Sequence, residues 1–255
     1  IKPGDVVTLQ FPNWAEFTIA YVACFKTGAV IQSLARNFNG ADLTYAMNLV
    51  ESRAYIGPTS FHGVDYEQQI LDIAGDIPTL KVIALVDKKA PKQTDLPTVA
   101  EIVATTEPLA EKVPVESDQV ACLLSTSGTT GKPKGVLLSH KNILSNDKIC
   151  IPRIIEIERK HALSFLPMSH IYERTVNYCY QLLGCSIFFA KSTDTIATDA
   201  LHARPYIMMV VPRVVERLYA KISSKGEALK GWRKSIFDWA IRLGMRYRPL
   251  SLIHI

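Results

Sequence analysis

Residues 123–136 of the chain read LLSTSGTTGKPKGV, a loop rich in glycine and hydroxyl groups between two apolar runs that favour β-strands. Glycine turns leave backbone N–H groups free to form an anion-binding hollow, and the hydroxyl groups add neutral hydrogen-bond donors. Lys132 and Lys134 supply positive charge. The composition of this stretch therefore predicts a loop that binds a polyphosphate.

The spacing of the loop differs from that of the Walker loop of P-loop NTPases. A Walker loop needs GxxxxGK followed directly by Ser or Thr, whereas Pro133 follows Gly131 and Lys132 here. The lysine is then not placed at the start of a helix, so this class is excluded. A serine hydrolase is set aside as well, because Ser127 lacks the GxSxG elbow that exposes a nucleophile.

The segments on both sides of the loop alternate between strand-like and helix-like patterns. Apolar runs predict strands at residues 6–11, 29–34, 54–56, 81–86, 119–124 and 162–166, and helical patterns begin near residues 13, 41, 66 and 139. Such alternation indicates βαβ units and a parallel sheet, that is, an α/β fold. Asn13, with Glu16 three residues later, is the expected N-cap of the first helix, and Gly28 should end it.

A second informative segment runs from Pro167 to Arg174, directly after the strand predicted at 162–166. It places His170 just past the carboxyl end of a strand, where open α/β sheets bind ligands. A lone histidine at this point is equally typical of a structural residue, so the position alone leaves both readings open.

Length and composition indicate a globular protein with a sizeable core, because 48% of the 255 residues are hydrophobic. No apolar run approaches the roughly 20 residues of a membrane-spanning helix. The five cysteines are an odd number without a CxxC pair, which favours reduced thiols in a cytoplasmic protein. The six histidines show no metal-ligand spacing.

The net charge of +5 is concentrated in one segment, since residues 213–248 hold ten Lys and Arg against three Asp and Glu. A solvated helix face explains this better than a nucleic-acid site, because no aromatic stacking pattern accompanies the charges. We therefore expect no nucleic-acid partner. Peripheral membrane contact and the oligomeric state stay open.

The run STSGTTGKPKG resembles the signature of the adenylate-forming (AMP-binding) superfamily, which includes acyl-CoA synthetases, aryl-acid ligases, nonribosomal adenylation domains and luciferases. The segment LPMSHIYER at 166–174 resembles the second motif of long-chain fatty acyl-CoA synthetases, as do residues 210–222 and 237–240. Residues 1–120 fit the superfamily more generally. The resemblance implies the parallel-sheet-rich βαβ layers of the large N-terminal domain of these enzymes.

The resemblance also implies a reaction in two steps. A carboxylate attacks the α-phosphate of ATP to give acyl-AMP and pyrophosphate, and the thiol of coenzyme A then displaces AMP. The small-molecule partners would be a fatty acid, ATP with Mg²⁺, and coenzyme A. By this analogy His170 would lie beside the acyl and adenylate pocket, and Thr126 would contact Mg²⁺. The residues assigned to ATP are Thr126, Ser127, Gly128, Thr129, Thr130, Gly131, Lys132 and Lys134.

Residues 1–249 are expected to form part of an N-terminal adenylation domain, with the small C-terminal domain absent. No YGxTE-like or YxTGD-like segment follows the second motif. We expect residues 250–255 to be a non-native tail, because they can be encoded by CTG TCT CTT ATA CAC ATC, which resembles a transposon end used to prepare sequencing libraries. The fragment should then be inactive and its full-length parent active. An aryl-acid or small-acid ligase and a non-catalytic nucleotide-binding module remain as alternatives.

Overall fold

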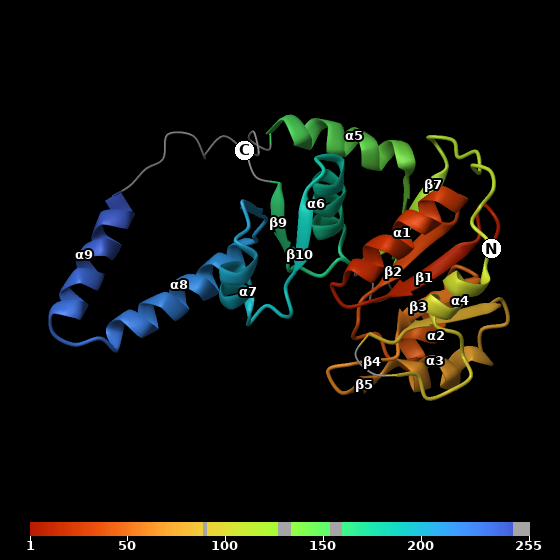
Figure 1. The fold of residues 1–255 in the computed structure, drawn as a ribbon, viewed down its shortest axis with the longest axis horizontal. Helices are drawn as coiled ribbons and strands as arrows, with labels where there is room; N and C mark the ends of the chain where they lie inside the picture. Colours follow the sequence, from red (N-terminus) through yellow and green to blue (C-terminus); the bar gives the residue numbers. More distant parts are fainter. Residues whose placement is uncertain (89–90, 127–133, 154–159, 247–255) are drawn as a thin grey trace. The chain divides into compact units, whose positions relative to one another are not determined.

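The computed structural model of the chain describes residues 1–88, 91–126, 134–153 and 160–246 (Figure 1). These residues divide into two compact units, one formed by Ile1–Met209 and one that begins at Val210. The first unit contains the β-sheets. The described part of the second unit contains the helices α8 (Pro212–Glu227) and α9 (Trp232–Arg246).

The large sheet of the first unit has the strand order β6-β3-β1-β2-β7-β8 within the described residues (Figure 1). Its strands are β1 (Val6–Gln10), β2 (Val30–Leu34), β3 (Ala54–Pro58), β6 (Val82–Val86), β7 (Val120–Thr126) and β8 (Lys134–Ser139). All neighbouring pairs are parallel except β7 and β8, which form an antiparallel hairpin. The predicted α/β fold with a mostly parallel sheet is therefore confirmed.

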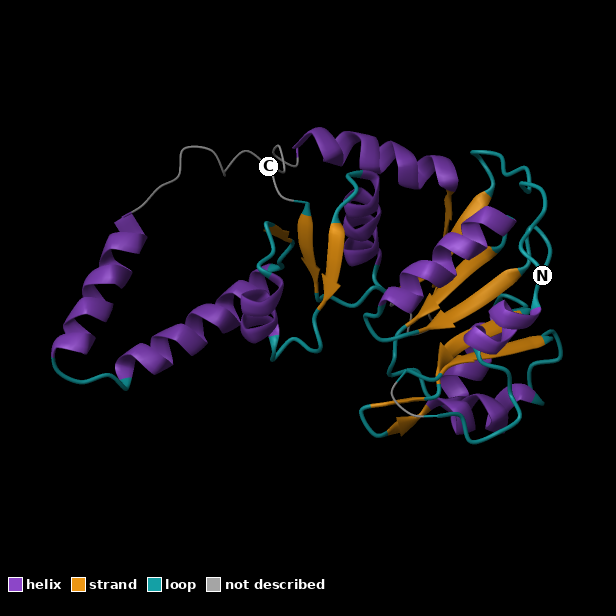
Figure 2. Ribbon diagram, viewed as in Figure 1, coloured by secondary structure: helices purple, strands orange, loops and turns teal. Residues whose placement is uncertain are grey.

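Helices cover this sheet on two sides (Figure 2). The helix α1 (Ala15–Thr27) packs Phe17 and Tyr21 into a core cluster with Leu9 of β1. The helices α2 (Gly40–Leu49) and α3 (Tyr66–Ala74) build a second cluster around Leu34 and Tyr55. Because successive strand residues point to opposite faces, β2 and β3 supply side chains to both clusters, Ile31 and Ala54 to the first and Leu34 and Tyr55 to the second.

The two ends of α1 differ in how well the sequence predicts them. Gly28 ends the helix as predicted, with a left-handed φ of 70° that favours glycine. The prediction that Asn13 caps the other end is wrong, because Trp14 is the N-cap residue and makes no side-chain capping bond. The amide of Asn13 instead bonds to backbone groups of a distant loop, at Leu166 and Met168.

A smaller parallel sheet in the described chain places β9 (His161–Ser164) between β10 (Ser186–Phe189) and β11 (Ile207–Met208). The helix α6 (Ile171–Leu182) packs Val176 and Tyr180 against β9. The remaining elements are β4 (Ser60–Phe61), β5 (Val64–Asp65), α4 (Val99–Thr105), α5 (His140–Cys150), a 3-10 turn (Ile151–Arg153) and α7 (Ile196–Ala203). Among the helices that the structure describes, none is long and apolar enough to cross a membrane.

Candidate active site

The hairpin of β7 and β8 carries the predicted phosphate loop. Its last described backbone pair joins Thr126 to Lys134. The predicted ligands from Ser127 to Lys132 lie outside the described residues. The strand β7 runs parallel to β2, with Ile31 opposite Cys122. It therefore ends at the carboxyl edge of the parallel strands, where open α/β sheets bind ligands.

His170 lies in a comparable place on the smaller sheet, because the loop that contains it follows the carboxyl end of β9. It occupies the N-cap position of α6 in an extended backbone conformation, and its side chain makes no capping bond. The backbone N–H of His170 donates to the carbonyl of Pro167 at 3.0 Å, which closes the loop into a turn. The residue is exposed, so its imidazole is accessible to a ligand.

Asn13 connects the two sheets at this edge. It follows the carboxyl end of β1, and its Oδ1 accepts a hydrogen bond from the backbone N–H of Met168 at 3.2 Å. Its Nδ2 donates to the carbonyl of Leu166. The segments that follow β1 and β9 are therefore joined, and the loop that carries His170 contacts the same edge of the large sheet at which β7, two strands from β1, ends.

Glu173 lies in the first turn of α6 and is only 2% exposed. Its Oε1 accepts hydrogen bonds from the hydroxyl of Ser164 and the amide of Asn177. Burial raises the pKa of Glu173 to about 7, although the bonds from Ser164 and Asn177 oppose this rise. The burial of Glu173 is not predicted from the sequence, because an acidic residue in a first helical turn is typically a solvent-exposed partner of the helix dipole.

Two further ionisable groups are buried here, Arg174 of α6 and Asp147 of α5. Arg174 is fully buried, and its three guanidinium nitrogens have no hydrogen-bond partner among the described residues. Asp147 of α5 accepts a hydrogen bond from the thiol of Cys179 at 3.5 Å, and burial raises the pKa of its carboxyl group. Buried polar groups are normally paired, so the unpaired guanidinium nitrogens of Arg174 and the buried carboxyl group of Asp147 distinguish the packing of α5 and α6 from that of an ordinary apolar core.

Metal binding is predicted only at Thr126, by resemblance. In the described parts of the chain, no group of three or more His, Cys, Asp or Glu side chains could hold a metal ion. The Mg²⁺ contact of Thr126 therefore stays a prediction.

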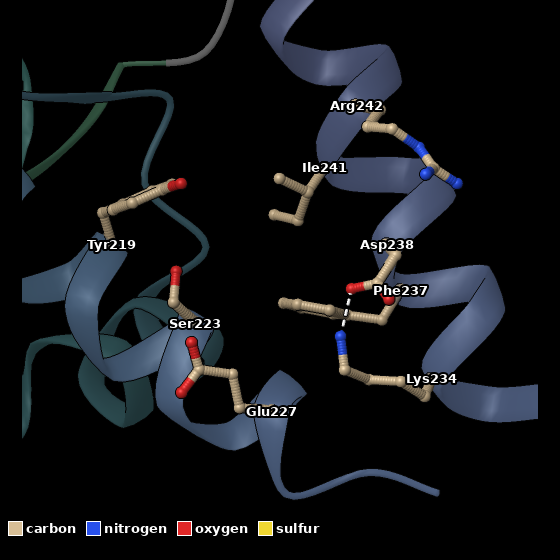
Figure 3. Close-up of a pocket in the computed structure, with 8 residues that line it drawn as sticks. All are labelled: Tyr219, Ser223, Glu227, Lys234, Phe237, Asp238, Ile241 and Arg242. Carbon is tan, nitrogen blue, oxygen red and sulfur yellow. Dashed lines mark hydrogen bonds and ion pairs between the residues drawn. The ribbon is translucent and has the colours of Figure 1, made fainter. Parts of the chain in front are cut away.

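A hollow of about 330 Å³ lies in the second unit, between α8 and α9 (Figure 3). Phe237 extends from α9 toward α8, and Lys234 forms an ion pair with Asp238 beside it. Gly226 of α8 permits this approach, because an added Cβ would lie 2.0 Å from the Phe237 ring. The described residues that line this hollow do not include His170.

Comparison with known proteins gives consistent matches over this chain. A family model described as AMP-binding enzyme matches residues 1–242. The medium-chain fatty-acid–CoA ligase of Escherichia coli is 36% identical over 154 residues, which cover 60% of this chain and 27% of that protein. Human long-chain-fatty-acid–CoA ligase 6 is 27% identical over 244 residues, which cover 86% of this chain and 33% of that protein.

The fold matches solved structures as well. A long-chain-fatty-acid-CoA ligase of Archaeoglobus fulgidus superposes with a TM-score of 0.75 at 17% identity, covering 88% of this chain and 43% of that one. The chain spans about a third or less of the length of the two curated relatives. Because the family model covers residues 1–242 of 255, the chain belongs to the AMP-binding enzyme family.

Proposed function

We propose that the protein containing this chain activates a carboxylic acid with ATP to form acyl-AMP and then transfers the acyl group to coenzyme A. One observation carries the proposal: Asn13 joins the carboxyl end of β1 to the loop after β9, at the edge where β7 ends. The hairpin that we propose to bind ATP and the loop with His170 therefore share one edge of the large sheet, with β2 between β1 and β7, and this supports a reaction between ATP and a second substrate.

In this proposal the residues of the β7–β8 hairpin bind the negatively charged phosphates of ATP. Backbone N–H groups and hydroxyls from Ser127 to Thr130, with Gly131, Lys132 and Lys134, bind the β- and γ-phosphates of ATP. Thr126 contributes a hydroxyl oxygen next to the phosphates. A hydroxyl oxygen together with phosphate oxygens is a donor set that suits Mg²⁺, which would neutralise phosphate charge when bound.

His170 acts beside the acyl and adenylate groups in this proposal. Its accessible position after β9 supports that role, since it leaves the imidazole available to the substrate. We propose a fatty acid as the substrate, because the relatives from Escherichia coli and human are named fatty-acid–CoA ligases. The activity is assigned to the complete protein, of which residues 1–249 form part of the large domain, and the chain alone is expected to be inactive.

Exchange of labelled pyrophosphate into ATP tests this proposal. The complete protein is incubated with ATP, Mg²⁺ and one acid at a time from a panel of short-chain, aryl and long-chain acids. Exchange that depends on a long-chain acid supports the proposal. Exchange with aryl or short-chain acids alone would show that the substrate is one of those acids and not a fatty acid. ATP binding without any exchange would contradict the proposed adenylating activity and favour a non-catalytic nucleotide-binding module.

A further inference from the structure

The loop from Phe165 to His170 is fixed by side chains of other segments. Its internal backbone hydrogen bond runs from the N–H of His170 to the carbonyl of Pro167. Asn13 holds the middle of the loop, and Glu173 holds the point where β9 ends. Two polar side chains that are far apart in the sequence therefore converge on one six-residue loop.

Asn13 uses both ends of its amide. Its oxygen accepts from the backbone N–H of Met168, and its nitrogen donates to the carbonyl of Leu166. An amide side chain can donate and accept at the same time, so Asn13 bonds to a carbonyl and an N–H group of the same loop. The side chain of Met168 is 2% exposed and packs in the core cluster that contains Trp14, so packing supports the same position.

Glu173, in the first turn of α6, holds the start of the loop. Its carboxylate accepts from the hydroxyl of Ser164, the last residue of β9, and from the backbone of Phe165. Asn177, one turn further along α6, donates to the Ser164 hydroxyl at 3.2 Å and to the Glu173 carbonyl at 2.9 Å. These bonds join the end of β9, which precedes His170 in the sequence, to the first turns of α6, which follow it.

We propose that Asn13 and Glu173 are positioning residues, which hold the β9–α6 loop so that His170 is presented to the reacting groups. This inference rests on the proposed function, since it assigns them an effect on acyl-AMP formation through His170. Neither residue touches the substrate in this account. Asn13 acts across 155 residues of sequence by fixing the backbone of Met168.

Hydrogen exchange of the chain tests whether Asn13 holds the β9–α6 loop, and it needs no measurement of enzyme activity. Asn13→Ala removes both bonds, and the exchange rate of the Met168 amide should rise about 10-fold, as expected for the loss of about one hydrogen bond. Asn48→Ala is the matched control, because the Asn48 amide also donates to a distant backbone carbonyl, that of Asp76 in the turn after α3. This control should leave the exchange of Met168 unchanged.

A double-mutant cycle in the complete protein tests the link to His170. Asn13→Ala should lower kcat for acyl-AMP formation about 10- to 100-fold and leave KM for ATP nearly unchanged, because small displacements of a reacting group are costly. In the His170→Ala background the same change should have almost no further effect. A purely structural role of Asn13 would lower activity by the same factor in both backgrounds. Glu173→Gln keeps an oxygen acceptor for Ser164 and should retain most of the activity that Glu173→Leu loses.

Several results would overturn the inference. The first is a double variant whose loss of kcat equals the product of the losses in Asn13→Ala and His170→Ala. The second is an Asn13→Ala variant with unchanged kinetics. The third is an unchanged hydrogen-exchange rate of the Met168 amide in Asn13→Ala. If His170→Ala leaves acyl-AMP formation intact, the positioning role is refuted while the adenylating activity stands. If the wild-type protein makes no acyl-AMP with any acid, the proposed function fails and the catalytic part of this inference fails with it.

Discussion

Replacing Glu173 by Gln should stabilise the chain at pH 8 and leave its stability almost unchanged at pH 4. The carboxyl group of Glu173 is buried, and burial raises its pKa from an ordinary value of 4.5 to about 7. Gln has the shape of the protonated acid and carries no charge. The variant therefore removes the cost of ionising a buried group and keeps the acceptor that Ser164 uses.

The magnitude follows from the two pKa values. Between pH 4.5 and 7 the folded state binds more protons at Glu173 than the unfolded state, so the free energy of unfolding falls as the pH rises. A difference of about 2.5 pKa units corresponds to about 3 kcal/mol at pH 8, with a slope of about 1.4 kcal/mol per pH unit between the two values. The advantage of the Gln variant should grow in this window and level off above it.

Urea unfolding at a fixed protein concentration, from pH 4 to pH 8.5, measures this difference. Glu67→Gln provides a matched control with the opposite sign, because Glu67 is also 2% exposed but accepts backbone N–H bonds from Gln93 and Thr94. Losing these charge-assisted bonds should destabilise that variant at neutral pH. A pH-independent effect of Glu173→Gln, or a wild type that gains stability relative to it as the pH rises, would refute the reasoning.

Three further predictions concern the hairpin lysine, the glycines of α8 and α9, and the association state of the chain. Lys134→Ala in the complete protein should lower kcat/KM for ATP about 10- to 100-fold if this lysine contacts phosphate charge in the transition state, and unchanged kinetics would argue against the assignment. Gly226→Ala should destabilise the α8–α9 pair by about 1–3 kcal/mol, because the added Cβ meets the Phe237 ring. Gly244→Ala, with open space at its Cβ, should stabilise α9 by up to about 1 kcal/mol. Equal thermal unfolding temperatures of the two variants would contradict this. The chain should self-associate and bind a hydrophobic dye through the exposed apolar residues of α9, such as Trp232 at 69% and Ile236 at 54% exposure, and a dye-free monomer in light scattering would speak against it.

The sequence predicts the large sheet well because its signals are local. The helix predicted to begin near residue 66 is observed as α3 (Tyr66–Ala74), since the apolar period that predicts it lies within the segment itself. The strand-like runs of the large sheet are nearly continuous and apolar, as expected for parallel strands covered by helices. The apolar runs on both sides of the predicted phosphate loop are likewise observed as strands, β7 and β8.

Other features depend on partners that the local pattern does not contain. The strand β10 has alternating exposed and half-buried residues, and β11 has two residues, so neither gives a strong strand signal. Asn13 matches the local pattern of a helix cap, but a loop more than 150 residues away supplies its partners. The burial of Glu173 and Arg174 likewise depends on how α6 packs against β9 and α5, which periodicity does not reveal.

Transfer of ¹⁸O from a labelled fatty acid tests the central claim most directly. The complete protein is given the acid with both carboxylate oxygens labelled, together with ATP, Mg²⁺ and coenzyme A, and the products are weighed by mass spectrometry. If the carboxylate attacks the α-phosphate, thiolysis of acyl-AMP breaks the bond between the acyl carbon and that oxygen, and the AMP released carries one ¹⁸O atom. Label in inorganic phosphate with ADP as the other product, or acyl-CoA formed without label in AMP, would contradict the account.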